Sequence, residues 1–207
     1  EPVGSQFLVE TSELAVSAAT VRNELHDLEE AGFLTHPHTS AGRMPTETGY
    51  QYYVTHLMKP DQIRKTVQGE LAKILGNYER REQALKQVAK YLAADGHYAV
   101  IIAFGLHSTY YTGISELFSQ AEFRSSVAAL DVSRLFDECE DRLPRLIAEL
   151  PAGETKIFIG RGNPLDRACG TVAARIGRND VCAVVGPMRM TYSKTYPMVQ
   201  YVCSILS

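Results

Sequence analysis

Four polar residues near the N-terminus have the types and spacing found on a DNA-reading helix: Ser17, Thr20, Arg22 and Asn23. Ser17 is a good N-cap, so the helix after it would point its first-turn N–H groups outward, where they can meet a phosphate. Thr20, Arg22 and Asn23 would project from that turn toward base edges. Because arginine can pair with guanine and asparagine with adenine, these residues are candidate DNA contacts.

A second group of candidate contacts lies in segment 36–43, His-Pro-His-Thr-Ser-Ala-Gly-Arg. His38, Thr39 and Ser40 offer hydrogen-bonding side chains, and Arg43 adds a guanidinium group. This composition suits a β-ribbon, or wing, that lies along a sugar–phosphate backbone. The alternative is a small helical domain whose polar face is simply solvated.

Other chemistries have little support in the sequence. Segment 160–163, Gly-Arg-Gly-Asn, lacks the Gly-Lys-Ser/Thr ending of a phosphate-binding loop. The four cysteines are too scattered for a disulfide framework and are expected to be reduced, buried side chains. No metal-ligand spacing completes the histidines, which include His26, His36 and His56. Since no nucleophile, base and acid can be assembled, we expect a non-enzyme without a metal or cofactor.

Residues 1–58 read as short helices followed by a ribbon, the layout of a winged helix-turn-helix. Ser5 is expected to cap a short helix through Glu10, and Ser17 a longer one that stops at Gly32. Extended pieces are predicted at 33–36 and 43–45. A further helix would begin after Thr46.

Residues 59–95 form a charged helical stretch with a heptad-like apolar seam. Gly76-Asn77 could divide it into two helices. The seam could pack onto its own domain or form a dimer coiled coil, and the sequence leaves both open. Its members are Val67, Leu71, Ile74, Tyr78, Leu85, Val88 and Leu92.

Residues 96–207 alternate strands and helices, which predicts an α+β sandwich with an antiparallel sheet. Strands are expected at 98–104, 156–159, 171–176 and 181–185, and helices at 114–118, 132–150 and the C-terminal end. We expect such a sheet to bury one face and leave the other free for a ligand or partner.

Composition and charge narrow the classes further. Residues 1–58 hold two basic and eight acidic residues, a net charge of −6, which argues against bulk attraction to DNA. The longest apolar run is strand-sized, so no membrane span is expected. The start at Glu1-Pro2 does not resemble a signal peptide, and the reduced cysteines favour a cytoplasmic protein.

Two groups of motifs lie at opposite ends of the chain. In the first half they are Glu-Pro-Val-Gly-Ser (1–5), Val-Ser-Ala-Ala-Thr-Val-Arg-Asn-Glu (16–24), Leu-Glu-Glu-Ala-Gly (28–32) and Pro-His-Thr-Ser-Ala-Gly-Arg-Met-Pro-Thr (37–46). In the second half they are Gly-Ile-Ser-Glu-Leu-Phe (113–118), Gln-Ala-Glu-Phe (120–123), Gly-Pro-Met-Arg-Met-Thr-Tyr (186–192) and Val-Gln-Tyr-Val (199–202). Together these motifs resemble the bacterial heat-inducible transcription repressor HrcA family.

The resemblance implies a winged-helix DNA-binding domain at 1–58, a helical linker at 59–95 and a GAF-like domain at 96–207. It also implies a homodimeric repressor that binds an inverted-repeat operator upstream of chaperone operons and has the chaperonin GroEL as a partner. By the same resemblance, the family's first helix would lie upstream of Glu1 and is expected to be missing from this sequence. The strand at 99–104 is expected to run almost directly into Gly113, without the family's inserted dimerisation domain, so the chain resembles a shortened member.

Two other functions remain open. The GAF-like domain could bind a small molecule and use DNA binding as its output. Alternatively, the acidic N-terminal segment could be a protein-interaction module built on a vestigial winged helix.

Overall fold

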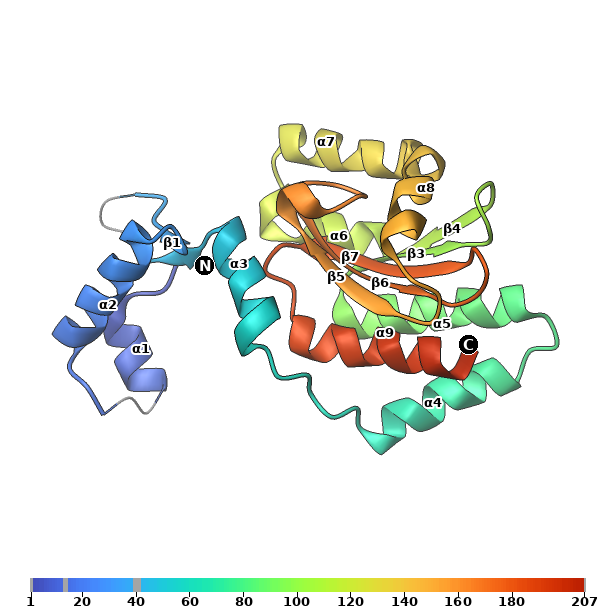
Figure 1. Ribbon diagram of the computed structural model, residues 1–207, viewed down its shortest axis with the longest axis horizontal. Helices are drawn as coiled ribbons and strands as arrows, with labels where there is room; N and C mark the ends of the chain where they lie inside the picture. Colours follow the sequence, from blue (N-terminus) through green and yellow to red (C-terminus); the bar gives the residue numbers. More distant parts are fainter. Residues whose placement is uncertain (1, 13–14, 39–41, 207) are drawn as a thin grey trace. The chain divides into compact units, whose positions relative to one another are not determined.

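The structure is a computed structural model that describes residues 2–12, 15–38 and 42–206 of the 207-residue chain (Figure 1). The chain divides into two compact units, Glu1–Leu57 and Met58–Ser207, here called unit 1 and unit 2. Segment 59–95 thus falls within unit 2, together with the strands that follow it.

Unit 1 consists of short helices and a small hairpin. Its elements are α1 (Ser5–Thr11), α2 (Ala18–Glu30), β1 (Leu34–Thr35), β2 (Met44–Pro45), α3 (Glu47–Tyr52) and a π-helical turn (Tyr53–Leu57). β1 and β2 pair antiparallel, and an isolated bridge between Val3 and Arg43 extends the pairing.

Local capping explains where these helices begin and end. The Ser17 side chain accepts a hydrogen bond from the Thr20 backbone N–H at 3.1 Å, which confirms the predicted cap of α2. Thr46 caps α3 in the same way, through the Gly49 N–H. Gly32 has φ +80°, the left-handed conformation that ends a helix, as predicted. The prediction for Ser5 was wrong: it is the first helical residue, and Gly4 occupies the cap.

Unit 2 is a five-stranded antiparallel sheet with strand order β4-β3-β7-β6-β5. Its helices are α4 (Lys65–Gly76), α5 (Arg81–Gly96), α6 (Ile114–Ser119), α7 (Ser126–Asp137), α8 (Cys139–Glu149) and α9 (Tyr192–Leu206), with short 3-10 turns at Ala121–Phe123 and Gly160–Gly162. Its strands are β3 (Ala99–Ala103), β4 (Thr109–Thr112), β5 (Thr155–Ile159), β6 (Cys169–Arg175) and β7 (Val181–Pro187).

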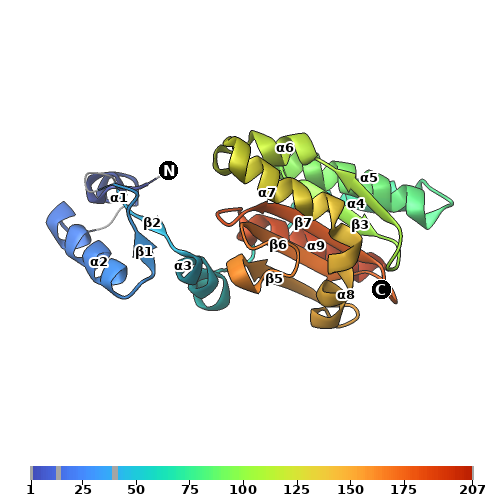
Figure 2. The same cartoon turned by 90° about the horizontal axis from the view of Figure 1, so that it is seen from above.

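Helices cover both faces of this sheet. α6, α7 and α8 lie on one face, and α5 and α9 on the other (Figures 1 and 2). Ile101 and Ala183 face the first layer, where they pack in one core cluster with Leu135 and Leu146. All residues of β3 and β7 are buried. The expectation of one free sheet face was therefore wrong, because the strands are apolar on both sides and need cover on both.

Two further sequence predictions need correction. β4, a Thr-Tyr-Tyr-Thr strand, was not predicted, and it lies between β3 and Gly113, so β3 does not run directly into that motif. The helical segment predicted at 132–150 is two helices, α7 and α8, which meet at Glu138.

The apolar seam of 59–95 packs within unit 2, which was one of the two alternatives. Leu71, Leu85 and Val88 are fully buried, and α4 contacts both α5 and α9. α4 ends at Gly76, so the predicted break between two helices is confirmed. Within unit 2, the seam therefore serves the core of the chain itself.

Core packing generates a stability prediction. Leu146 on α8 is fully buried, whereas Leu130 on α7 is 61% exposed. We expect Leu146→Ala to lower the free energy of unfolding of unit 2 by about 2–5 kcal/mol, because it leaves a cavity under the sheet. The matched control Leu130→Ala should change it by less than about 0.5 kcal/mol. Urea unfolding followed by circular dichroism measures both, and equal effects would contradict the described core.

Candidate nucleic-acid interface

The N-terminal turn of α2 presents the first group of candidate contacts. The Ser17 and Thr20 hydroxyl oxygens lie 2.9 Å apart, and both residues are exposed. Because the Thr20 N–H is already bonded to Ser17, it does not point at an open site for phosphate. One hydroxyl of the pair donates to the other, so one hydroxyl hydrogen remains to meet an oxygen from outside.

Arg22 and Asn23 lie one turn further along α2. Both are exposed, and no hydrogen bond or ion pair engages either side chain within the residues that the structure describes. A guanidinium group and an amide in this state can contact a ligand without first breaking an internal bond. They are therefore the sequence-predicted residues best placed to bind something outside the chain.

Glu29 joins the end of α2 to the hairpin. Its carboxylate oxygens bond the His36 ring Nδ1 and, at 2.7 Å, the Arg43 Nε. His36 follows β1 and Arg43 precedes β2, so one carboxylate fixes both arms of the hairpin against the helix. Arg43 is thus a candidate phosphate contact whose side chain is 24% exposed and ion-paired. No short-range signal in the sequence marked the partners of Glu29.

The rest of segment 36–43 is only partly described. His38 is exposed, while Thr39 and Ser40 lie outside the described residues. Of the two arginines in residues 1–58, Arg22 alone lacks an acidic partner within the parts of unit 1 that the structure describes. Because Glu29 offsets the charge of Arg43, this segment offers less positive charge to an external phosphate than its two arginines would give if both were unpaired.

A polar network in unit 2 unites two of the motifs that were distant in sequence. Arg189, in the turn before α9, bonds the Glu122 carboxylate and, at 3.1 Å, the Gln120 side-chain oxygen. Gln120 donates to the His97 carbonyl, and the His97 ring lies 3.0 Å from Glu116. Burial acts to raise the pKa of Glu122, but the Arg189 hydrogen bond, a backbone hydrogen bond and the Arg189 charge act together to hold this pKa below its usual value. The network fixes the ends of the sheet rather than offering an unpaired group.

The cysteines offer no reactive thiol. All four are buried and free. Burial raises the pKa of Cys139 to about 11 and that of Cys182 to about 12, so both stay protonated near neutral pH. Among the described residues, no group of three or more His, Cys, Asp or Glu side chains could hold a metal ion, and no helix is long and apolar enough to span a bilayer.

The Glu29 cluster generates a pH prediction. The His36 hydrogen bond, with the Arg43 charge behind it, holds the pKa of Glu29 below its ordinary value of 4.5, against the opposing effect of burial. A lowered folded-state pKa stabilises above the unfolded value, and this contribution is lost as pH falls through the folded value. We expect a carboxyl NMR titration midpoint for Glu29 below 4.5. Arg43→Ala should raise it, whereas Arg22→Ala should not. A midpoint at or above the ordinary value would refute the described contacts.

A family model and several curated relatives match the chain. The family model described as HrcA protein C terminal domain matches residues 55–196. Over 103 residues the chain is 40% identical to the heat-inducible transcription repressor HrcA of Halalkalibacterium halodurans, covering 49% of this chain and 30% of that protein. Over 108 residues it is 45% identical to the repressor of the same name from Synechococcus elongatus, covering 51% and 31%. The match therefore spans about 30% of the length of these relatives.

One solved structure shares the overall fold. A crystal structure described as a hypothetical protein at 2.2 Å resolution superposes with a TM-score of 0.72 at 16% identity, over 100% of this chain and 91% of that one. At this identity the likeness concerns the fold alone. The family model takes in more than half of the residues, including the whole five-stranded sheet and the polar network around Arg189. The chain accordingly belongs to the HrcA family.

Proposed function

We propose that the chain is a sequence-specific transcriptional repressor that binds an inverted-repeat operator of heat-shock chaperone operons. The observation that carries the proposal is the exposed pair Arg22 and Asn23 on a capped helix, α2, next to a hairpin. A helix of this kind can enter the major groove while a wing follows the backbone. The names of the relatives as heat-inducible repressors support the same role.

Unit 1 in this proposal is a winged helix-turn-helix. α1 and α2 supply the two helices, and the β1–β2 hairpin, extended by the Val3–Arg43 bridge, supplies the wing. Ser17, Thr20, Arg22 and Asn23 would contact DNA from α2. His38, Thr39, Ser40 and Arg43 would contact it from the wing. Arg43 would then have to exchange Glu29 for a phosphate oxygen, so its contribution depends on the cost of that exchange.

Unit 2 in this proposal is a GAF-like domain that supports dimerisation. The strand order β4-β3-β7-β6-β5, with helices on both faces, is the feature that supports the assignment. A homodimer is proposed because a two-fold operator calls for a two-fold protein. The chaperonin GroEL is proposed as a partner on family resemblance.

A second candidate function is a protein-interaction module. Net charge −6 over residues 1–58 and the Glu29–Arg43 ion pair both favour it, since they weaken attraction to DNA. The titration described next separates the two candidates.

The proposal predicts specific binding to a duplex that carries the inverted repeat of a chaperone promoter. At physiological salt we expect it to bind at least about 10³-fold tighter than a scrambled duplex of equal length. Fluorescence anisotropy measures the affinities, and analytical sedimentation of the complex should find two chains per duplex. Equal affinity for the two duplexes would refute the proposed repressor function and favour the protein-interaction module.

Asn23 and Arg43 should differ in what they contribute. Asn23→Ala should cost about 1–3 kcal/mol on the operator and relax discrimination at one base pair, because an amide reads a base edge. Arg43→Ala, the matched comparison, should weaken all sequences alike and lower the salt-dependence slope by about one. Affinity measurements on operator and single-substitution duplexes at several salt concentrations test both. If Asn23→Ala weakens specific and nonspecific duplexes equally, Asn23 is not a base reader.

A further inference from the structure

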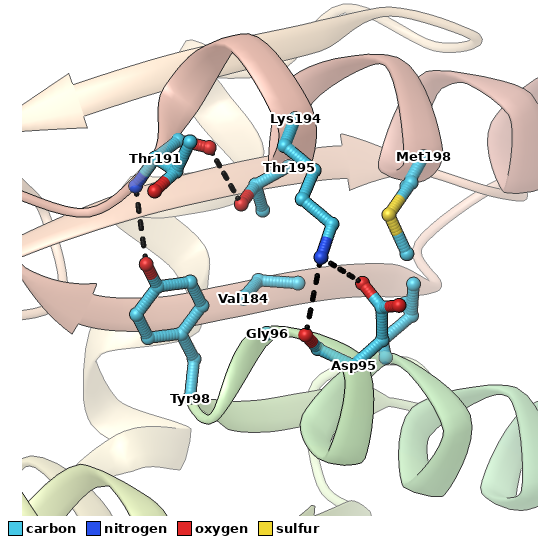
Figure 3. A pocket seen from close by; sticks show the side chains of 9 residues that line it. Asp95, Gly96, Tyr98, Val184, Thr191, Lys194, Thr195 and Met198 are labelled. Atoms are coloured by element: carbon cyan, nitrogen blue, oxygen red, sulfur yellow. Dashed lines mark hydrogen bonds and ion pairs between the residues drawn. The ribbon is translucent and has the colours of Figure 1, made fainter. Parts of the chain in front are cut away.

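A cavity of about 260 Å³ lies in unit 2 between the segment before α4 and the first turns of α9. Its polar lining includes Arg64 and the Asp95–Lys194 pair, and its apolar lining includes Val67, Pro197 and Met198. A smaller cavity of about 60 Å³ is also lined by Asp95, Lys194 and Met198 (Figure 3). The Asp95–Lys194 ion pair therefore borders both cavities.

Residues 61–64, which line the larger cavity, are held to α9 by a hydrogen bond that depends on Pro197. Pro197 has no N–H, so the carbonyl four residues earlier, that of Ser193, lacks its helical partner. The Asp61 backbone N–H donates to this carbonyl at 2.8 Å instead. The same segment continues along the chain into unit 1. An occupant of the cavity would therefore contact residues 61–64 of this segment.

The charges of the Asp95–Lys194 ion pair lie at the unfavourable ends of the two helices that carry them. Asp95 lies in the last turn of α5, and Lys194 is the third residue of α9. Each charge opposes the dipole of its own helix. They compensate one another at 2.8 Å, and the Lys194 ammonium also donates to the Asp95 carbonyl, as the dashed lines of Figure 3 show. Residues whose charge conflicts with the preference of their own helix are expected mainly at functional sites.

Arg64 is the positively charged lining residue that is available to bind a ligand. No ion pair or side-chain hydrogen bond engages it within the described residues, whereas Lys194 is committed to Asp95. Some of these charges also act on Tyr91 of α5. Burial and the Asp95 and Glu70 charges raise the pKa of its hydroxyl, and the Arg64 and Lys194 charges oppose that rise. The cavity thus combines an unpaired guanidinium group with an apolar wall.

We propose that this cavity binds a small monocarboxylate with a short apolar chain. Arg64 would hold the carboxylate through paired N–H donors, the geometry that a guanidinium group offers. The chain of the ligand would lie against Val67, Pro197 and Met198. The volume is at or below the lower end for ligand pockets, about 300 Å³, which restricts the ligand to a small molecule. The inference goes beyond the proposed function and does not rest on it, since ligand binding is measured without DNA.

The test uses the full chain with ¹³C-labelled methionine methyl groups and hexanoate as the probe. We expect a saturable shift of the Met198 methyl signal. Arg64→Gln should weaken hexanoate binding at least tenfold, while Lys65→Gln, an exposed neighbour outside the cavity lining, should leave it unchanged. Hexan-1-ol and hexylamine should bind at least tenfold more weakly than hexanoate. Thermal unfolding of both variants verifies that they fold.

A second measurement follows the hydrogen bond that holds residues 61–64 to α9. Hexanoate should slow hydrogen exchange of the Asp61 amide in the unmutated chain and leave it unchanged in Arg64→Gln. Absence of a saturable Met198 shift, equal binding of the alcohol or amine, or unaltered affinity in folded Arg64→Gln would each overturn the assignment. None of these outcomes bears on DNA binding, so the two proposals fail separately.

Discussion

Burial of the sheet on both faces is the constraint on which unit 2 depends. β3 and β7 are buried along their whole length, and β6 is buried except at Arg175. Strands that are apolar on both sides require two helical layers, and these cover the central strands β3, β7 and β6 on both faces. The ion pairs of unit 2 discussed above consequently lie near the ends of strands and helices, where Arg189 pairs with Glu122 and Lys194 pairs with Asp95.

Unit 1 is held together differently. Among its described residues, Ser5 and Val21 are the buried ones, and large apolar side chains such as Phe7 remain exposed. Polar contacts therefore carry much of its local geometry: the Ser17 cap fixes the start of α2, and Glu29 ties the end of that helix to the hairpin. The exposed polar turn of α2 is positioned by these contacts, which is why the proposed function is assigned to this unit.

Signals confined to a few residues were readable in the sequence, and long-range contacts were not. Ser17 and Gly32 mark the ends of α2 because caps act within one turn of the chain. β4 was missed because its Thr-Tyr-Tyr-Thr stretch is short and has no apolar alternation. The Glu29 contacts bring together a helix and both hairpin arms, and no periodicity encodes that approach. The cover over the second sheet face likewise depends on where α5 and α9 pack.

The central claim is that α2 and the wing contact DNA while unit 2 does not read it. Hydrogen-exchange mass spectrometry of the intact chain, with and without a saturating inverted-repeat duplex, tests this claim most directly. We expect slower exchange in peptides covering 17–23 and 36–43, with no protection at the strands of unit 2 beyond what the free chain shows. Protection confined to unit 2, with the peptide covering 17–23 unaltered by the duplex, would contradict it.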